Sequence, residues 1–366
     1  MAVIIGVLGW VIAISIGRGA PASAPTVVAP RLDLPGRVIV LDTTSGRLGA
    51  ARPDGSGFAP FSGPGFPAKT QAKTAVVSPD GGHVIVGDTQ VVDLEPGGEH
   101  VRAKPLTAGD AFVGPQPFAD HETRAVFATS PGTGRGRMMS VDLDGGSRHD
   151  LGPADGAAIG DPRRDGAIVA VEGKTEVNIG RYTERNTSRV ELRAWHRPST
   201  RLAATAGLLK EAGLPSGPTY VIGPTVSPDG SLVALSIDEL TPNVNSVTAK
   251  HALVVTDRSG RAIASRASFT SARPAWSRDG AQLAYLDDQG VVLLRISGAR
   301  ATTSSIPAQV SGQPCLFSPA GGHLLCDDRV TQERFIVTLA DGRVDRLPLD
   351  PAHLAVAWLP ARGGAG

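Results

Sequence analysis

The sequence predicts an all-β fold, a seven-bladed β-propeller whose ring is closed by strands from the N- and C-terminal ends of the chain. Three observations lead to this prediction. A short turn phrase, Ser-Pro-Asp-Gly or a close variant, recurs along the 366 residues. Its copies recur about every 40–50 residues, and units of this length built from strands favour a β-propeller over a helical solenoid. Incomplete units stand at both ends of the repeated region.

The turn phrase is typical of a tight β-hairpin. Proline sets φ for the first central position, aspartate tolerates the second, and glycine takes the left-handed position that ends the turn. On either side the residues alternate between apolar and polar, as in strands with one buried face. Clear copies occupy residues 78–81, 227–230, 277–280 and 318–321, and weaker copies occupy 118–122 and 163–166.

The spacing of the turns indicates one blade per copy. The glycine position falls at residues 81, 122, 166, 230, 280 and 321, so the intervals are 41, 44, 64, 50 and 41 residues. A second strand pair follows each of several turns, for example at residues 138–148, 251–261, 291–300 and 334–343. About four strands per unit make one blade, and a blade needs a neighbour on each face, so the units must stack into a ring.

The two ends of the repeated region supply the seventh blade. Residues 37–47 match the outer strands of a unit but have no hairpin before them, and residues 354–362 match an inner strand with nothing after it. Each piece is expected to be half a blade. Joined, they add one shared blade to six internal ones and remove the open sheet edge that strand proteins must protect.

The repeat resembles that of the TolB-type propeller family, whose typical form is Trp-Ser-Pro-Asp-Gly followed by an alternating strand. The resemblance covers residues 37–362 and implies the fold, with little information about function. TolB carries an α/β domain before its propeller, whereas residues 19–36 read here as a linker, so the role of TolB is not transferred. Prolyl-oligopeptidase-type propellers share the repeat, but residues 37–362 leave no room for their hydrolase domain.

The first residues predict a membrane segment. They read MAVIIGVLGWVIAISIG, 17 residues without a charge, which would span about 26 Å as a helix. Residues 1–18 are therefore expected to be a retained single-pass anchor or a cleaved export signal, with the anchor favoured. Residues 19–36 form an Ala/Pro-rich linker, and residues 37–362 form an extracytoplasmic propeller at the cell membrane; secretion after cleavage is the alternative.

The only two cysteines, Cys315 and Cys326, flank a predicted hairpin whose turn lies near Gly321. In an antiparallel strand pair, the residue numbers of opposite residues have a constant sum, and 315 + 326 equals 316 + 325. The two cysteines should therefore lie opposite each other across the strand pair, within reach of a disulfide. An exported domain would allow the bond to form. The alternative is a pair of small buried thiols.

A run of regularly spaced arginines is the candidate binding surface. The spacing of four residues is even, so on strands the side chains would share one face. A basic surface of this kind would attract an acidic protein or an anionic cell-envelope polymer, and the alternative is a solvated face in an arginine-rich protein. The candidate residues are Arg181, Arg185, Arg189, Arg193 and Arg197.

Taken together, the sequence favours a non-catalytic binding or scaffold protein of the bacterial cell envelope. The formal net charge is only +1, so no nucleic-acid partner is expected, and a monomer is expected. No catalytic residue, metal site or cofactor is predicted, and the sequence has no Gly-x-Ser-x-Gly elbow. The alternative is a propeller enzyme, such as a lactonase, lyase or glycan hydrolase, with acidic, histidine or arginine side chains converging at the channel mouth.

Overall fold

The described part of the chain is a propeller. The computed structural model describes residues 34–62, 74–87, 90–94, 101–106, 111–129, 136–154, 156–171, 177–178, 181–182, 188–211, 213, 219–242, 247–267, 274–287, 290–298, 300–307, 315–328 and 331–360. They belong to one compact unit, Asp33–Gly366. The expected anchor at residues 1–18 lies outside the described residues. Within the ranges given, no helix has both the length and the apolar character needed to cross a membrane.

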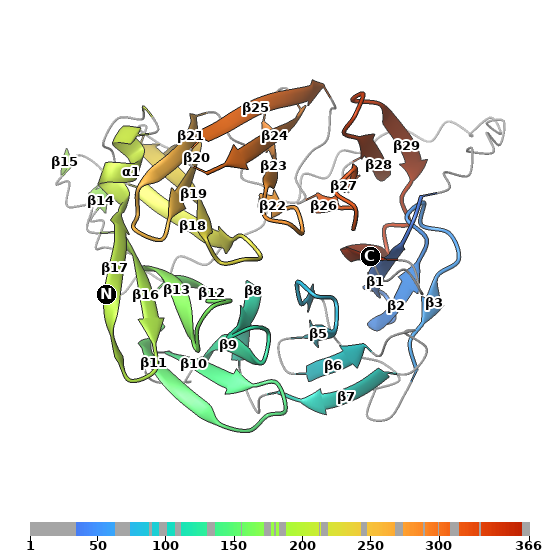
Figure 1. Ribbon diagram of the computed structural model, residues 1–366, viewed down its shortest axis with the longest axis horizontal. Coiled ribbons are helices and arrows are strands. Elements are labelled where there is room, and N and C mark those ends of the chain that lie inside the picture. The colour runs from blue at the N-terminus through green and yellow to red at the C-terminus, as the bar shows by residue number, and fades with distance from the viewer. Residues whose placement is uncertain are drawn as a thin grey trace. The chain divides into compact units, whose positions relative to one another are not determined.

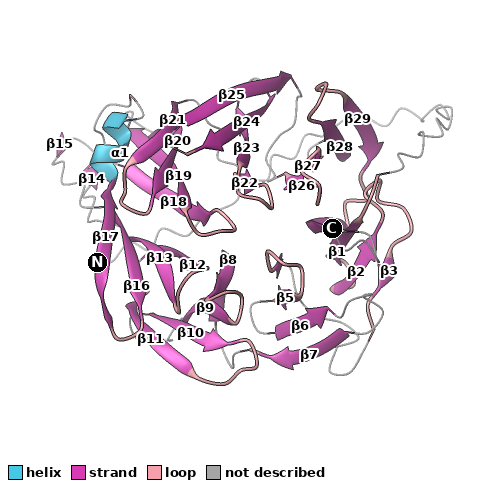
Figure 2. Cartoon of the chain, viewed as in Figure 1, coloured by secondary structure: helices cyan, strands magenta, loops and turns pink. Residues whose placement is uncertain are grey.

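Seven four-stranded antiparallel sheets follow one another around a common centre (Figure 1). This arrangement confirms the seven-bladed β-propeller that the repeat predicts. Figure 2 shows how strands dominate the unit, and the one α-helix among the described residues is α1 (Thr205–Glu211). A two-stranded hairpin, β14 (Val177–Asn178) with β15 (Arg181–Tyr182), lies in the long connection within the third sheet.

The first three blades follow chain order, and in each the first strand is innermost. Blade 1 comprises β4 (Ala75–Val77), β5 (His83–Val86), β6 (Gln90–Leu94) and β7 (Val101–Pro105). Blade 2 comprises β8 (Ala111–Ala119), β9 (Arg124–Thr129), β10 (Arg137–Asp142) and β11 (Arg148–Pro153). Blade 3 comprises β12 (Gly156–Gly160), β13 (Gly166–Val171), β16 (Arg189–Ala194) and β17 (Arg197–Ala204).

The remaining blades complete the ring, and the last of them draws on both ends of the propeller. Blade 4 comprises β18 (Thr219–Val226), β19 (Leu232–Pro242), β20 (Val247–Asp257) and β21 (Ala262–Ala267). Blade 5 comprises β22 (Ala275–Trp276), β23 (Gln282–Asp287), β24 (Gly290–Ser297) and β25 (Arg300–Pro307). Blade 6 comprises β26 (Leu316–Phe317), β27 (His323–Asp328), β28 (Glu333–Thr338) and β29 (Val344–Pro348). Blade 7 comprises β30 (His353–Leu359), β1 (Arg37–Asp42), β2 (Arg47–Ala51) and β3 (Ala59–Pro60).

Blade 7 closes the ring as the sequence predicts. Strand β30 pairs antiparallel with β1, from Arg37 opposite Leu359 to Asp42 opposite His353. The division differs from the expected two halves, because β1, β2 and β3 give three strands and β30 gives one. The third strand was missed because β3 is only two residues long and shows no alternation.

The recurring turn forms a hairpin held by its own side chains. The Ser227 hydroxyl accepts a hydrogen bond from the Leu232 amide at 2.9 Å and donates one to Asp229 at 2.6 Å. The Gly230 amide donates to the Ser227 carbonyl at 2.7 Å, and Gly230 has a φ of 68°. A glycine reaches this left-handed conformation without steric cost, which explains why the phrase ends in glycine.

The two weak copies depart from this scheme in different ways. In blade 2 the glycine position is taken by Glu122, with a φ of 66°. In blade 3 the sequence alignment was wrong by two residues, because the turn runs from Asp161 to Arg164 and Gly166 already belongs to β13. The Arg164 amide donates to the Asp161 carbonyl at 3.0 Å, so Asp161 stands where other blades have serine.

Hydrophobic side chains between neighbouring sheets form the core. One cluster joins blades 3 and 4 and includes Ile168 and Leu235, with Leu208 and Leu209 of α1 packed into it. Burying such side chains contributes about 1.5–3 kcal/mol each. Because each blade shares its core with the next, the inner strands are held around a fixed centre.

Candidate functional site: the central channel

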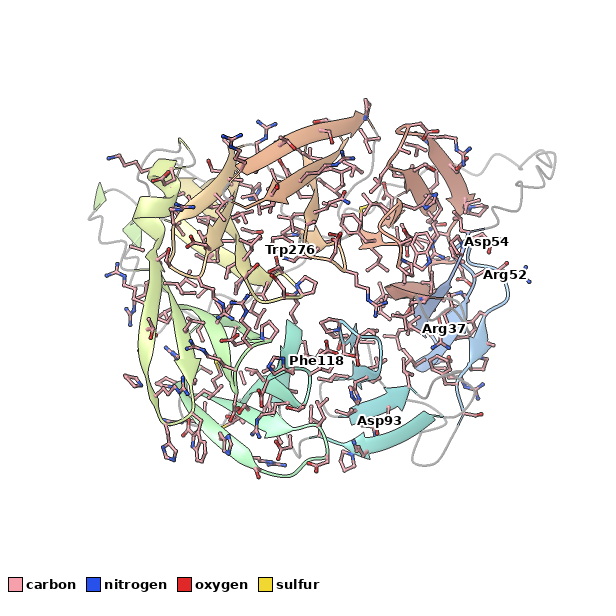
Figure 3. The ribbon with its side chains drawn as sticks, in the orientation of Figure 1. Arg37, Arg52, Asp54, Asp93, Phe118 and Trp276 are labelled. Atoms are coloured by element: carbon pink, nitrogen blue, oxygen red, sulfur yellow. A yellow bond between two sulfur atoms is a disulfide. The ribbon has the colours of Figure 1, made fainter. Side chains whose placement is uncertain are left out.

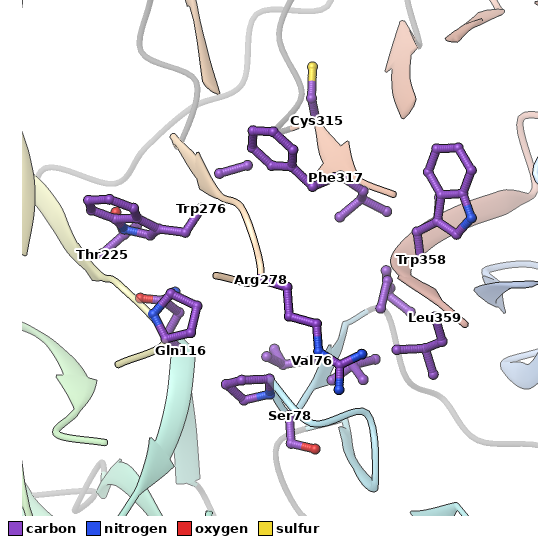
Figure 4. Close-up of a pocket in the computed structure, with 18 of the residues that line it drawn as sticks. Val76, Ser78, Gln116, Thr225, Trp276, Arg278, Cys315, Phe317, Trp358 and Leu359 are labelled. Atoms are coloured by element: carbon purple, nitrogen blue, oxygen red, sulfur yellow. The ribbon is translucent and has the colours of Figure 1, made fainter. Parts of the chain in front are cut away.

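The inner strands of all seven blades surround a cavity of about 610 Å³ (Figure 4). This volume lies within the roughly 300–1,000 Å³ of typical small-molecule sites. One end of the cavity is lined by turns that join the first and second strands of a blade. We call this end the turn rim and define it by Pro79, Pro228, Arg278 and Pro319.

The blades contribute unequally to the lining of the cavity, because the inner strands of blades 2 and 3 pack almost backbone to backbone. A Cβ atom on Gly114 would lie 2.3 Å from the Ala158 carbonyl oxygen, and one on Gly160 would lie 2.2 Å from the Phe118 carbonyl oxygen. Blade 3 accordingly lines the cavity only with Gly160 and Pro162. The aromatic lining comes from Phe118, Trp276, Phe317 and Trp358, and Figure 3 labels Phe118 and Trp276 beside the centre of the ring.

Gln116 ties two non-adjacent inner strands together beside the cavity. Its side-chain oxygen accepts a hydrogen bond from the Val226 amide at 2.6 Å, and its nitrogen donates to the Val226 carbonyl at 3.2 Å. This pair links blade 2 to blade 4 across the short strand of blade 3. The amide of Gln116 is therefore a structural part of the wall.

Two charged side chains belong to the described lining, and they differ in their surroundings. Asp327 accepts hydrogen bonds from Arg334 at 2.7 and 3.0 Å, and both side chains are buried. Arg278 is exposed and makes no hydrogen bond or ion pair with a described residue. It occupies the position that proline takes in the other clear copies of the turn, and Figure 4 shows its guanidinium projecting into the pocket.

Two buried polar atoms of the wall have no hydrogen-bond partner among the described residues. They are Oγ1 of Thr225 in blade 4 and Nε1 of Trp276 in blade 5. Both residues line the cavity. Buried polar atoms are nearly always paired in folded proteins, and a water molecule or a ligand is the usual partner where the protein supplies none.

A carboxyl pair joins the turns of blades 1 and 2. Oε2 of Glu122 accepts a hydrogen bond from the Asp80 amide at 3.1 Å. Burial, followed by a hydrogen bond to the Asp80 carboxyl group, raises the pKa of Glu122 to about 7. The pKa of Asp80 is lowered by hydrogen bonds from Glu122, Ser78 and the Gly82 amide, which outweigh its burial. The described residues contain no group of three or more side chains suited to hold a metal ion.

The candidate arginines do not form one continuous surface in the described residues. Arg193 is buried, donating to Glu191 at 3.1 Å and to the Pro153 carbonyl at 2.6 Å, so it joins blade 3 to blade 2. Arg189 pairs with Glu191 and is partly exposed. Arg197 is exposed. Arg185 and the side chain of Arg181 lie outside the described residues. Of the described side chains, those of Arg189, Arg193 and Arg197 do not line the cavity.

Cys315 directly precedes β26, the innermost strand of blade 6, and Cys326 lies on the neighbouring strand β27. Cys315 and Cys326 are joined by a disulfide with a Cα–Cα distance of 4.3 Å. The register that places Leu316 opposite Leu325 puts them on facing positions. Cys315 lies in the channel wall, so the bond ties the innermost strand of blade 6 to its neighbour.

The fold and channel define a seven-bladed β-propeller protein with a mainly apolar, neutral central cavity. No protein-family model matches the chain, and no curated protein matches it. Among solved structures, the dihydro-heme d1 dehydrogenase NirN is 15% identical with a TM-score of 0.50, covering 88% of this chain and 66% of that one.

Two further solved structures are also similar to this chain. An oligogalacturonate lyase in complex with manganese is 11% identical with a TM-score of 0.49, covering 86% of this chain and 83% of that one. TolB from Acinetobacter baumannii is 14% identical with a TM-score of 0.40, covering 78% and 66%. At 15% identity the likeness to NirN shows the propeller fold alone, and no family assignment follows.

Proposed function

We propose that this chain is a non-catalytic binding or scaffold protein of the cell envelope. The observation that carries the proposal is the lining of the channel. An enzyme site would bring several acidic, histidine or arginine side chains to one place. The described lining instead offers apolar and neutral side chains, one ion-paired carboxylate and one unpaired arginine.

The partner is proposed to be a protein, or an anionic polymer of the envelope, captured on the outer side of blade 3. Trp195 follows β16 and is 43% exposed, the only large hydrophobic side chain so exposed among the described residues. Its ring stacks on His149 at 3.7 Å between centroids. Arg197 lies two residues further on and is exposed. Tryptophan and arginine are the residue types that most often dominate the energy of protein interfaces.

The same proposal places the propeller outside the cytoplasm, held by residues 1–18 as a single-pass anchor. The hydrophobic, uncharged character of that segment supports this placement. In this arrangement the linker at residues 19–36 would tether the propeller to the anchor.

Crosslinking in intact cells, followed by affinity capture of the full chain, tests the proposal. Trp195→Ala combined with Arg197→Ala should remove the captured partner, and Arg300→Ala, an exposed arginine of blade 5, is the control. Protease added outside the cells should digest the propeller if it is extracytoplasmic. Unchanged capture by the double variant, or protection from protease in intact cells but not in lysed cells, would contradict the proposal.

A further inference from the structure

We infer that the central channel binds a small organic monoanion with an apolar, ring-sized body, whose anionic group contacts Arg278. This site is separate from the partner surface proposed on blade 3. The inference rests on three features of the channel: an unpaired guanidinium, an aromatic wall, and buried polar atoms without partners.

Arg278 is the feature that selects an anion. The turns of blades 1, 4 and 6 have proline at this position, namely Pro79, Pro228 and Pro319. Only the blade 5 turn replaces that ring with a long cationic side chain, which projects into the pocket (Figure 4). A planar guanidinium binds a carboxylate through two parallel hydrogen bonds. The N–H groups of Arg278 are available for these bonds, because no described residue accepts from them.

The wall beside Arg278 suits an apolar body. Trp276 ends β22, two residues before Arg278, and Phe317 lies on the inner strand of the next blade. Flat apolar groups gain from stacking on aromatic rings in addition to the area they bury. The volume of about 610 Å³ is sufficient for a ligand of two or three fused rings.

Two buried polar atoms are the third feature of the wall. Trp276 Nε1 and Thr225 Oγ1 lie in the part of the wall formed by blades 4 and 5, and neither has a hydrogen-bond partner among the described residues. The residue Thr225 is only 4% exposed. Both groups can donate a hydrogen bond. A hydrogen-bond acceptor is the partner that both groups lack.

The turn rim also limits the charge of the ligand. The pKa values of Asp80, Asp229 and Asp279 are all lowered, because the Ser78, Ser227 and Ser277 hydroxyls and nearby amides donate to the carboxylates. These carboxylates are ionised and are hydrogen-bonded within their own turns and, for Asp80, also to Glu122 of blade 2, so they leave Arg278 free. They would repel a polyanion at the same rim, which favours a single negative charge.

Calorimetric titration of the full chain with 2-naphthoate and with neutral 2-naphthamide tests the inference. The two probes have the same ring system and differ in charge, and titration into the detergent buffer alone serves as the blank. The wild-type chain should bind one naphthoate about tenfold more tightly than naphthamide, as expected for a charge-assisted hydrogen bond. Arg278→Gln should remove this preference, and Arg295→Gln, an exposed arginine on β24 of the same blade, should retain it.

Three results would overturn the inference. They are equal affinity of the wild-type chain for the two probes, unchanged naphthoate affinity in Arg278→Gln, and no saturable naphthoate binding by folded wild-type chain. Thermal unfolding of each variant establishes that it is folded, and Arg278 is exposed, so its replacement should leave the unfolding temperature unchanged. Because the partner experiment uses variants of blade 3, failure of one proposal leaves the other standing.

Discussion

The buried ion pair between Arg334 and Asp327 should contribute strongly to stability, because it links two neighbouring strands of blade 6 while Arg334 also donates to the Pro53 carbonyl of blade 7 at 3.4 Å. Both side chains are almost fully buried, at 2% and 7% exposure. Two hydrogen bonds of 2.7 and 3.0 Å connect them. Arg334 also lies beneath the 53–55 turn of blade 7, where a Cβ on Gly55 would be 3.2 Å from its Nη1.

Arg334→Met removes the cation and leaves the Asp327 carboxylate buried without its partner. Breaking a buried pair in this way costs about 3–5 kcal/mol. Urea unfolding followed by tryptophan fluorescence measures the loss. Arg343→Met is the matched control, since Arg343 pairs with Asp345 in the same blade but is 59% exposed, and an exposed pair contributes about 0–1 kcal/mol.

A double-mutant cycle with Asp327→Asn completes the test. If the pair acts as described, the double variant should lose less stability than the sum of the two single variants. The reasoning is refuted if Arg334→Met costs no more than the Arg343→Met control. It is equally refuted if the effects of the two single substitutions simply add.

Three further predictions concern the turns and the disulfide. Glu122→Gln should be more stable than wild type at about pH 8 by about 1 kcal/mol, after discounting for solvent screening. The raised pKa of about 7 makes the stabilising contribution of Glu122 complete below its unfolded pKa and lost as pH rises through 7. The urea midpoint of wild type should therefore fall relative to that of Glu122→Gln as the pH rises from low to high. A difference between the two midpoints that does not change with pH would exclude this account. Gly230→Ala should cost about 1–2 kcal/mol, because φ is 68° and the new Cβ would lie 2.8 Å from Cγ of Arg163; an unchanged melting temperature would contradict it. Reducing the disulfide, which spans a sequence separation of 11, should lower stability by about 2–3 kcal/mol. The Cys315→Ala, Cys326→Ala double variant should not respond to the reductant.

The number of blades and the closure of the ring were predictable because both depend on local signals. A turn that requires proline, aspartate and glycine can be recognised in the sequence, and so can a strand whose residues alternate between apolar and polar. The pairing of Arg37 with Leu359 follows from the same pattern. The prediction misplaced the blade 3 turn, because Asp161 and Pro162 occupy the serine and proline positions of the Ser-Pro-Asp-Gly phrase and no glycine follows at the fourth position.

The arginine surface could not be predicted in the same way. An even spacing places side chains on one face of a strand, but in a propeller that face can be an interface between blades. Arg193 is buried there because Glu191 and the Pro153 carbonyl satisfy its guanidinium. Arg278 was visible in the sequence as a departure from the Ser-Pro-Asp-Gly turn. Its projection into the channel depends on the radius of the ring, which no short motif specifies.

The seam of blade 7 makes this propeller a natural candidate for circular permutation. Nε1 of Trp358 donates a hydrogen bond to the Pro35 carbonyl at 3.1 Å, at the place where each other blade has its first turn. A genetically encoded Ser-Pro-Asp-Gly linker between these strands would make blade 7 continuous. New ends could then be opened at the exposed Ser259, in the turn between the outer two strands of blade 4. Such a rearranged chain would shift the seam from blade 7 to blade 4 while preserving every inner strand that surrounds the channel.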